Sequence, residues 1–189
     1  LIDSVAKEIC KSLNPKNQIV ASVVAGVPFE HLETIFQVQE KTPVLFRLIP
    51  NTAISVLQSM TVISAYKASE AQIETITGIF NELGKTIVIE ERLMTAATAL
   101  CSCGTAYALR YIQAAMEGGV EMGLYPEQAK FIASQTVKGA AELLLAHNAH
   151  PEAEIDKVTT PGGITIKGLN EMESAGFSSA VIRGLKASK

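Results

Sequence analysis

The pattern of apolar residues changes near Glu91, and this change constrains the fold more than any other feature of the sequence. Before it, short apolar runs typical of buried strands alternate with segments in which apolar residues recur at helical spacing. The expected strands cover residues 18–24, 44–49, 61–66 and 85–90. Because repeated strand–helix–strand units build parallel sheets with right-handed crossovers, the first half of the chain predicts a mainly parallel sheet.

Individual residues in this first half indicate where its helices begin and end. Residues 1–9 already show helical spacing. Pro28 suits the first position of a helix, where its missing N–H costs nothing. Ser69 and Gln72 are spaced as a capping box, and Gly84 is expected to close the helix that follows them.

After Glu91 the strand pattern stops and only helical spacing remains. The expected helices cover residues 94–121, with a break near Gly104, then 126–147, a short helix from Pro151, residues 164–175 up to Gly176, and a last helix capped by Ser178. The sequence therefore predicts an α/β domain over residues 1–91 followed by an all-α domain over residues 92–189.

Composition excludes several classes of protein. Apolar residues make up 48% of the chain and charged residues 19%, so a disordered chain is excluded. Sixteen Lys and Arg against 19 Asp and Glu leave a net charge of −3, which offers no basic face for nucleic acid. The longest weakly charged stretch, residues 93–109, is too short and too polar for a membrane span. Three cysteines, an odd number, fit a reduced intracellular compartment, and we expect a cytoplasmic protein.

Most side chains that could carry chemistry have a simpler structural interpretation. Cys101 and Cys103 are two positions apart on a predicted helix, do not share a face, and are expected to be buried structural thiols rather than metal ligands. The remaining candidates are scattered histidines and paired carboxylates at expected helix and strand ends, namely His31, His147, His150, Glu90, Glu91, Glu152 and Glu154. We therefore expect no metal site and a solvated position for these carboxylates.

Residues 158–169 are the informative segment, because consecutive small residues lead directly into a helix. Glycines let backbone N–H groups approach a ligand, and a helix N-terminus favours an anion. Thr159, Thr160 and Thr165 add hydroxyl groups. On these grounds alone, an anion site and a loop that only caps a helix both stay open.

Thr160-Pro161-Gly162-Gly163-x-Thr165, followed by Gly168-Leu169 and Glu171-Met172-Glu173, resembles the signature of the pyrroline-5-carboxylate reductases. Other segments resemble the same family in order and spacing: Ala25-Gly26-Val27, Arg47-Leu48-Ile49-Pro50-Asn51-Thr52, Gly104-Thr105-Ala106-Tyr107, Glu117-Gly118-Gly119-Val120, Gly123-Leu124 and Gly139-Ala140-Ala141. The resemblance extends over essentially the whole chain.

The resemblance implies an oxidoreductase of proline biosynthesis. It implies hydride transfer from NADPH or NADH to the C=N of 1-pyrroline-5-carboxylate, a cyclic imino acid, giving L-proline. The fold implied is an incomplete Rossmann-like parallel sheet domain plus a C-terminal helical dimerisation domain, whose helices interleave in a homodimer or higher homo-oligomer.

The resemblance also implies roles for individual residues. Backbone N–H groups around Gly162 and Gly163, with the Thr160 hydroxyl, hold the substrate carboxylate. Thr165 hydrogen-bonds the imine nitrogen and is the expected catalytic residue. Val158 and Thr159 line the substrate pocket. The nicotinamide half of the cofactor lies along Ala25, Pro50 and Asn51.

The chain departs from the family in two places. Thr105 stands where the family usually has Pro, and the family's N-terminal glycine-rich nucleotide fingerprint is not among the residues printed. We therefore expect that the protein begins upstream of Leu1 and that residues 1–189 alone bind neither cofactor usefully.

Two alternatives stay open. One is another two-domain reductase of the β-hydroxyacid dehydrogenase type, for which Lys138 is the obvious catalytic candidate but has no motif around it. The other is a truncated, non-catalytic dimer module.

Overall fold

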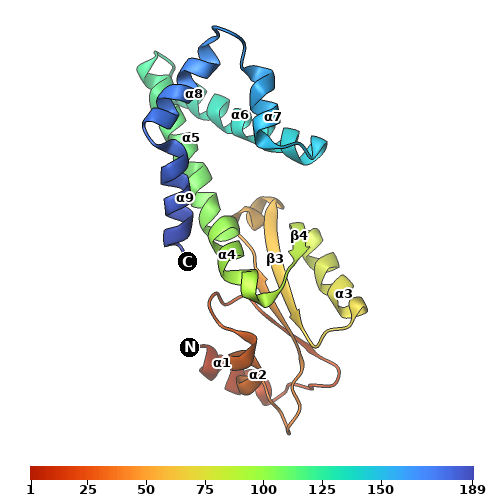
Figure 1. Ribbon diagram of the computed structural model, residues 1–189. Coiled ribbons are helices and arrows are strands. Elements are labelled where there is room, and N and C mark those ends of the chain that lie inside the picture. The colour runs from red at the N-terminus through yellow and green to blue at the C-terminus, as the bar shows by residue number, and fades with distance from the viewer. The chain divides into compact units, whose positions relative to one another are not determined.

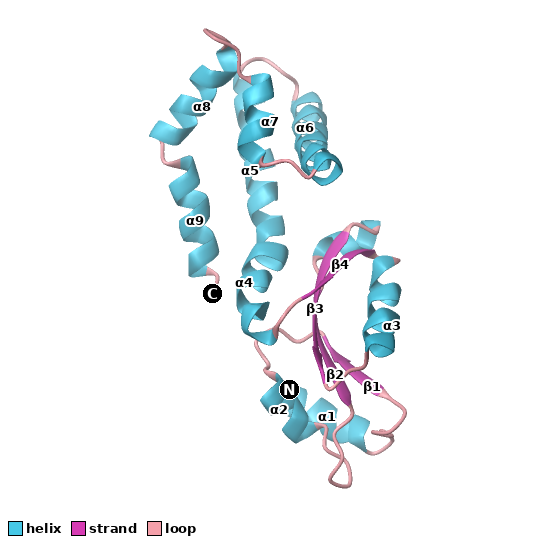
Figure 2. Ribbon diagram, turned by 45° about the vertical axis from the view of Figure 1, so that its right-hand side comes forward, coloured by secondary structure: helices cyan, strands magenta, loops and turns pink.

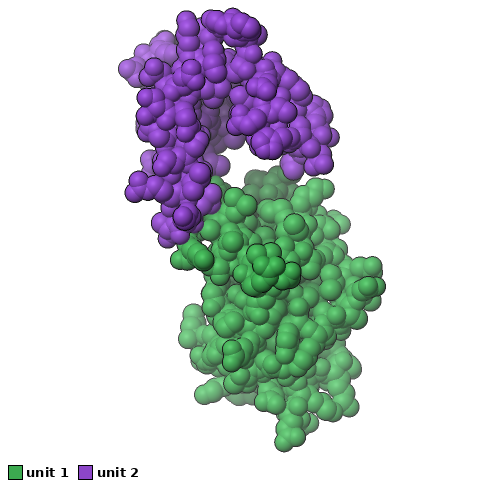
Figure 3. Space-filling model, in the orientation of Figure 1, with its two compact units in different colours: residues 1–105, 188–189 green, residues 106–187 purple.

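The computed structural model describes residues 1–189 and divides into two compact units. Unit 1 comprises Leu1–Thr105 with Ser188–Lys189, and unit 2 comprises Ala106–Ala187 (Figure 3). Unit 1 holds every strand of the protein, whereas unit 2 is entirely helical (Figure 1). The predicted order, α/β followed by all-α, is confirmed.

The sheet of unit 1 contains β1 (Ile19–Ser22), β2 (Val44–Ile49), β3 (Ser59–Tyr66) and β4 (Gly84–Val88), side by side in chain order. β1 with β2 and β3 with β4 are parallel pairs, but β2 and β3 are antiparallel. The expectation of parallel crossovers is wrong for this pair. The connection between them, residues 50–58, holds only the short helix η1 (Thr52–Val56), and a parallel crossover needs about a dozen residues or more.

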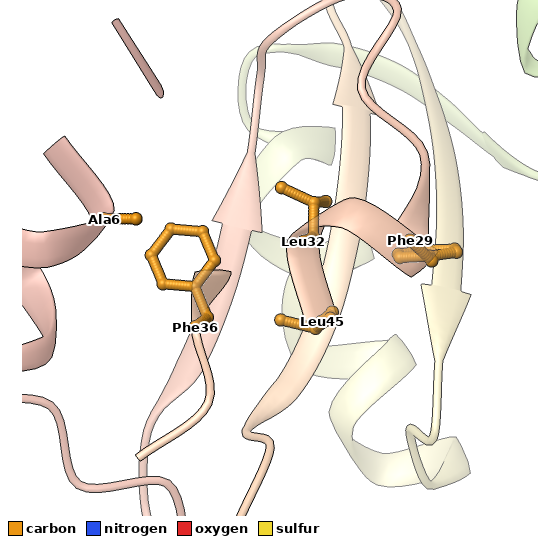
Figure 4. Packing of buried hydrophobic residues seen from close by; sticks show 5 residues of the cluster. All are labelled: Ala6, Phe29, Leu32, Phe36 and Leu45. Atoms are coloured by element: carbon orange, nitrogen blue, oxygen red, sulfur yellow. The ribbon is translucent and has the colours of Figure 1, made fainter. Parts of the chain in front are cut away.

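Helices cover both faces of this sheet (Figure 2). On one face α1 (Ile2–Cys10) and α2 (Phe29–Ile35) pack against β2. The buried side chains of this cluster are Ala6, Phe29, Leu32, Phe36 and Leu45 (Figure 4). On the other face α3 (Glu70–Asn81) contributes Ile76 to a cluster with residues of β2 and β3. β2 is therefore buried on both sides, as its nearly continuous apolar run predicts.

The capping box at Ser69 is confirmed, with the Gln72 amide 3.4 Å from the Ser69 hydroxyl and the Ser69 amide 2.9 Å from the Gln72 side chain. The prediction for Gly84 is wrong, because α3 ends at Asn81 and Gly84 is the first residue of β4. Gly84 has φ +148°, and a Cβ there would collide with the backbone of Ser59 on β3. Close strand approach, rather than helix termination, explains this glycine.

After β4 the chain forms the short helix η2 (Glu91–Leu93), then α4 (Met94–Thr98), a π-helical turn (Ala99–Cys103) and α5 (Gly104–Glu121). The helix is not broken near Gly104 as predicted: it changes to this π-helical turn just before Gly104, and the flanking residues Thr98 and Gly104 keep right-handed helical backbone angles. The Cys101 carbonyl accepts hydrogen bonds from the side chains of Asn51, at 3.2 Å, and Thr105, at 3.3 Å. Side chains that insert into the helical hydrogen-bond ladder are a common cause of such irregular turns.

Unit 2 continues with α6 (Pro126–His147), α7 (Pro151–Val158), α8 (Ile164–Ser174) and α9 (Phe177–Ala187). Proline begins α6 and α7 as predicted, and Gly176, with φ +85°, follows the end of α8. Ser178 does not cap α9 but lies within it, and its hydroxyl donates to Glu173 at 2.7 Å. None of the helices combines the length and apolar character that a bilayer crossing requires.

Candidate active site

The glycine loop, residues 158–165, joins α7 to α8 within unit 2. α7 ends at Val158, and the Thr159 hydroxyl donates back to the carbonyls of Ile155 and Asp156, each at 3.2 Å. This hydroxyl therefore closes α7. Thr159 has no free hydroxyl donor to offer a ligand in this arrangement.

The next four residues form a tight turn with the pattern of a type II turn. The Gly163 amide donates to the Thr160 carbonyl at 2.9 Å, Pro161 is the first central residue, and Gly162 has φ +73°. A type II turn requires positive φ at that second central position, which only glycine adopts without strain. A Cβ on Gly163 would lie 2.5 Å from the Thr160 hydroxyl oxygen, so the second glycine is needed for space.

The turn leads straight into the N-terminus of α8, where Gly163 is the capping residue and makes no side-chain cap. The first amides of the helix, from Ile164 onward, therefore point out of α8 without an intrahelical partner. Thr165 is exposed, and its hydroxyl makes no hydrogen bond within the protein. Ile164 is 87% exposed. The loop thus offers unpaired donors and a hydroxyl beside uncovered apolar surface.

The remaining predicted positions lie in unit 1, at the carboxyl edge of its sheet. β1 and β2 run parallel, with Ser22 opposite Arg47. The exposed turn at Ala25 and Gly26 follows the end of β1, and Pro50 follows the end of β2. The structure therefore brings Ala25, Pro50 and Asn51 to one edge. In open α/β sheets, ligands bind outside the carboxyl ends of the strands.

Asn51 uses both polar ends of its side chain inside the protein. Its Oδ1 accepts from the Ala53 amide at 3.1 Å, which caps η1, and its Nδ2 donates to the Cys101 carbonyl at 3.2 Å. The Asn51 amide donates to the Ser59 hydroxyl at 3.2 Å. Its side chain thus holds the π-helical turn.

Glu91, expected at a solvated strand end, is instead bound within unit 1. Its Oε1 accepts hydrogen bonds from the Phe29 amide and from Nη1 of Arg47, each at 2.7 Å. The expectation for Glu91 is wrong because the sequence around Glu91 does not show its distant partners. The sequence signal for a buried ion pair was the charged Arg47 inside the apolar run of β2, since a buried guanidinium needs an anion beside it.

Glu154 is likewise not solvated, with a side chain that is 12% exposed. It accepts a hydrogen bond from Lys157 at 2.6 Å and lies 3.4 Å from Nδ1 of His147. The hydrogen bond from Lys157, followed by that from His147, holds the pKa of Glu154 below its usual value, although partial burial opposes them. The contact with His147 joins α7 to the end of α6.

Cys101 is a structural thiol, as predicted. Its Sγ donates to the carbonyls of Met60, at 3.0 Å, and Ile49, at 3.4 Å, and burial raises its pKa. All three cysteines are free. The structure contains no cluster of three His, Cys, Asp or Glu side chains that could hold a metal ion.

Comparison with known proteins identifies the family. The sequence model for pyrroline-5-carboxylate reductase dimerisation matches residues 91–189, which is more than half of the chain. The chain belongs to the pyrroline-5-carboxylate reductase family. The match begins at Glu91, where the sequence pattern changes from strands to helices.

Individual members of the pyrroline-5-carboxylate reductase family also match, and the two from Dictyostelium discoideum cover 100% and 94% of this chain. Pyrroline-5-carboxylate reductase 1 of Dictyostelium discoideum is 46% identical and covers 100% of this chain. The chain spans 35% and 64% of the lengths of the two Dictyostelium reductases that it matches.

Solved structures of pyrroline-5-carboxylate reductases share the fold. The Coxiella burnetii enzyme superimposes with a TM-score of 0.91 at 28% identity, over 99% of this chain and 69% of that one. The Plasmodium falciparum enzyme, solved with NADP bound, gives a TM-score of 0.88 at 27% identity, over 99% and 74%. The Rossmann-like character expected for the sheet domain is thereby confirmed.

Proposed function

We propose that this protein is a pyrroline-5-carboxylate reductase, which transfers a hydride from NADPH or NADH to the C=N of 1-pyrroline-5-carboxylate and forms L-proline. The observation that carries the proposal is the glycine loop, in which a Thr-Pro-Gly-Gly turn opens onto an uncapped helix in a chain of this family. An imine is basic, and its protonated form accepts hydride readily. The site therefore needs no strong acid, and none lies in the loop.

In this proposal the glycine loop binds the substrate. The uncapped amides at the N-terminus of α8, the Gly162 amide and the Thr160 hydroxyl hold the carboxylate, which the helix dipole favours. The Gly163 amide stays bound to the Thr160 carbonyl and keeps the turn closed around the ligand. The Thr165 hydroxyl hydrogen-bonds the ring nitrogen and keeps the imine in one orientation. Val158 and Thr159 line the pocket. One hydrogen bond to a charged group contributes about 1.5–3 kcal/mol.

The carboxyl edge of unit 1 holds the nicotinamide half of the cofactor in this proposal. The exposed turn at Ala25 and Gly26 leaves room for a flat ring. The space beside Gly26 is open, since a Cβ built there would meet no atom within 4 Å. Pro50 and the main chain of Asn51 form the neighbouring part of that edge. The bound cofactor supplies the hydride, and the protein supplies orientation.

We also propose a homodimer built through the helical domain, residues 92–189, with residues 1–91 serving the cofactor. Helix α6 exposes large apolar side chains, among them Phe131 at 71% and Leu145 at 79%. Within unit 2, α5, the turn after it, α8 and α9 line an apolar groove of about 650 Å³, whose lining includes Tyr111, Met122 and Phe177. Apolar surface on this scale marks an interaction site.

Three free thiols support a cytoplasmic location.

The test is a reductase assay on the protein expressed from its complete gene. We expect oxidation of NADPH or NADH that depends on 1-pyrroline-5-carboxylate, with L-proline as the product. Cofactor binding without imine reduction, together with oxidation of a β-hydroxyacid, would support the other reductase class. A stable dimer that binds no cofactor would support the non-catalytic module.

A further inference from the structure

One oxygen of Glu91 joins two segments of unit 1 that are far apart in the sequence. Oε1 accepts from the Phe29 amide, 62 residues away, and from Nη1 of Arg47, 44 residues away, both at 2.7 Å. Phe29 is the first residue of α2, so the carboxylate replaces the cap that Pro28 does not provide. Arg47 lies on β2 with its guanidinium 5.9 Å from the centre of the Phe29 ring. The three residues form one connected group.

The charge on Glu91 is needed at this position. Arg47 is only 8% exposed, and its Nε is buried without a hydrogen-bond partner. The guanidinium therefore depends on the Glu91 carboxylate, which is itself 37% exposed. Removing one partner of such a pair leaves an uncompensated buried charge, which destabilises more than removing both partners.

Both groups held by Glu91 adjoin the carboxyl edge. The Phe29 amide lies directly after the loop that contains Ala25, and Arg47 lies three residues before Pro50. We propose that Glu91 is a positioning residue for the nicotinamide half of the cofactor, setting the relative placement of these two segments. This inference rests on the proposed function, and it gives the first residue of η2 a role at the reacting end of the site.

The test compares Glu91→Gln with Glu90→Gln in the protein expressed from its complete gene. Glutamine keeps an oxygen for the Phe29 amide but removes the charge that Arg47 needs. Glu90 is the matched control, because its carboxylate binds only the exposed Arg92. We expect Glu91→Gln to weaken equilibrium binding of NADPH or NADH roughly tenfold, a change of about 1.4 kcal/mol. The KM for the imine should stay within about twofold.

A direct structural readout accompanies binding. In Glu91→Gln, amide hydrogen exchange should become faster in residues 25–32 and 45–51, and it should stay unchanged in α8. Glu90→Gln should match the parent in both measurements.

The double variant Glu91→Gln with Arg47→Met separates positioning from stability. Removing the unpaired charge should restore most of the melting temperature that Glu91→Gln loses. Cofactor binding should nevertheless remain weak, because the anchored Arg47 is gone. If Glu91→Gln does not fold, this double variant decides the question alone.

Cofactor binding within about twofold of the parent, in whichever of these variants folds, overturns the positioning role. If the parent protein binds cofactor but does not reduce the imine, the proposed reaction is wrong, while the positioning role of Glu91 still stands. A parent that binds neither NADPH nor NADH overturns both.

Discussion

Thr165 has an exposed hydroxyl that makes no hydrogen bond within the protein. The Thr159 hydroxyl in the same loop differs, because it is bound to the carbonyls of Ile155 and Asp156. Replacing Thr165 by Ala should lower kcat/KM for the imine by roughly ten- to a hundredfold, the scale of one hydrogen bond to a charged group. Thr165→Ser should recover most of the activity, because it keeps the hydroxyl. Initial rates and melting temperatures measured on the same samples test this.

The control for Thr165 is Thr75→Ala, since Thr75 lies on α3 and its hydroxyl only bonds back to the Ala71 carbonyl at 2.7 Å. It should keep full activity. If Thr165→Ala turns over within about threefold of the parent, the assignment is wrong, and the Thr160 hydroxyl becomes the next candidate. A loss of about 1 kcal/mol in stability with full activity would instead indicate helix capping.

Gly163 offers a second prediction at the residue scale. A Cβ there would lie 2.5 Å from the Thr160 hydroxyl oxygen, so Gly163→Ala must push Thr160 or the turn aside. We expect the KM for the imine to rise about tenfold or more while cofactor binding is kept. Gly168→Ala, on the same helix with open space around it, is the matched control and should behave like the parent. Unchanged imine KM in Gly163→Ala would contradict a role for this turn in substrate binding.

At the scale of elements, Asn51 connects η1 to the π-helical turn. Asn51→Ala removes the cap on Ala53 and the donor to the Cys101 carbonyl, and should cost about 1–3 kcal/mol of stability. Asn51→Asp keeps the cap but places an acceptor against that carbonyl. We expect hydrogen exchange in residues 99–105 to accelerate in both variants, whereas exchange in η1 should accelerate only in Asn51→Ala. Equal exchange of residues 99–105 in parent and variants would show that the π-helical turn does not depend on Asn51.

At the scale of the whole molecule, light scattering at micromolar concentration should give at least a dimer. Obligate interfaces bury more than about 2,000 Å², and the exposed apolar residues of α6 lie on helical surface suited to such an interface. Phe131→Glu should shift the protein toward the monomer, whereas Lys16→Glu, in exposed sequence of unit 1, should not. A parent that is monomeric, or a Phe131→Glu variant with an unchanged mass, would refute this interface.

The elements of this protein were predictable because their signals are local. Helical spacing, the Ser69 capping box, and prolines at the starts of α6 and α7 each depend on residues within one or two turns. The glycine loop was predictable for the same reason, since its turn and the following helix lie within eight residues. Proposing that it binds a substrate required the family resemblance, because a turn before a helix can be an anion site or a loop that only caps the helix.

Tertiary structure decided what depends on distant segments. The antiparallel β2–β3 pair follows from a short connection, and the need for Gly84 follows from the backbone of Ser59 on the neighbouring strand. Glu91 meets Arg47, and Asn51 meets Cys101, only after the sheet and helices have packed. Burial then gives these contacts their strength, because a charge or amide removed from water must find its partner within the fold.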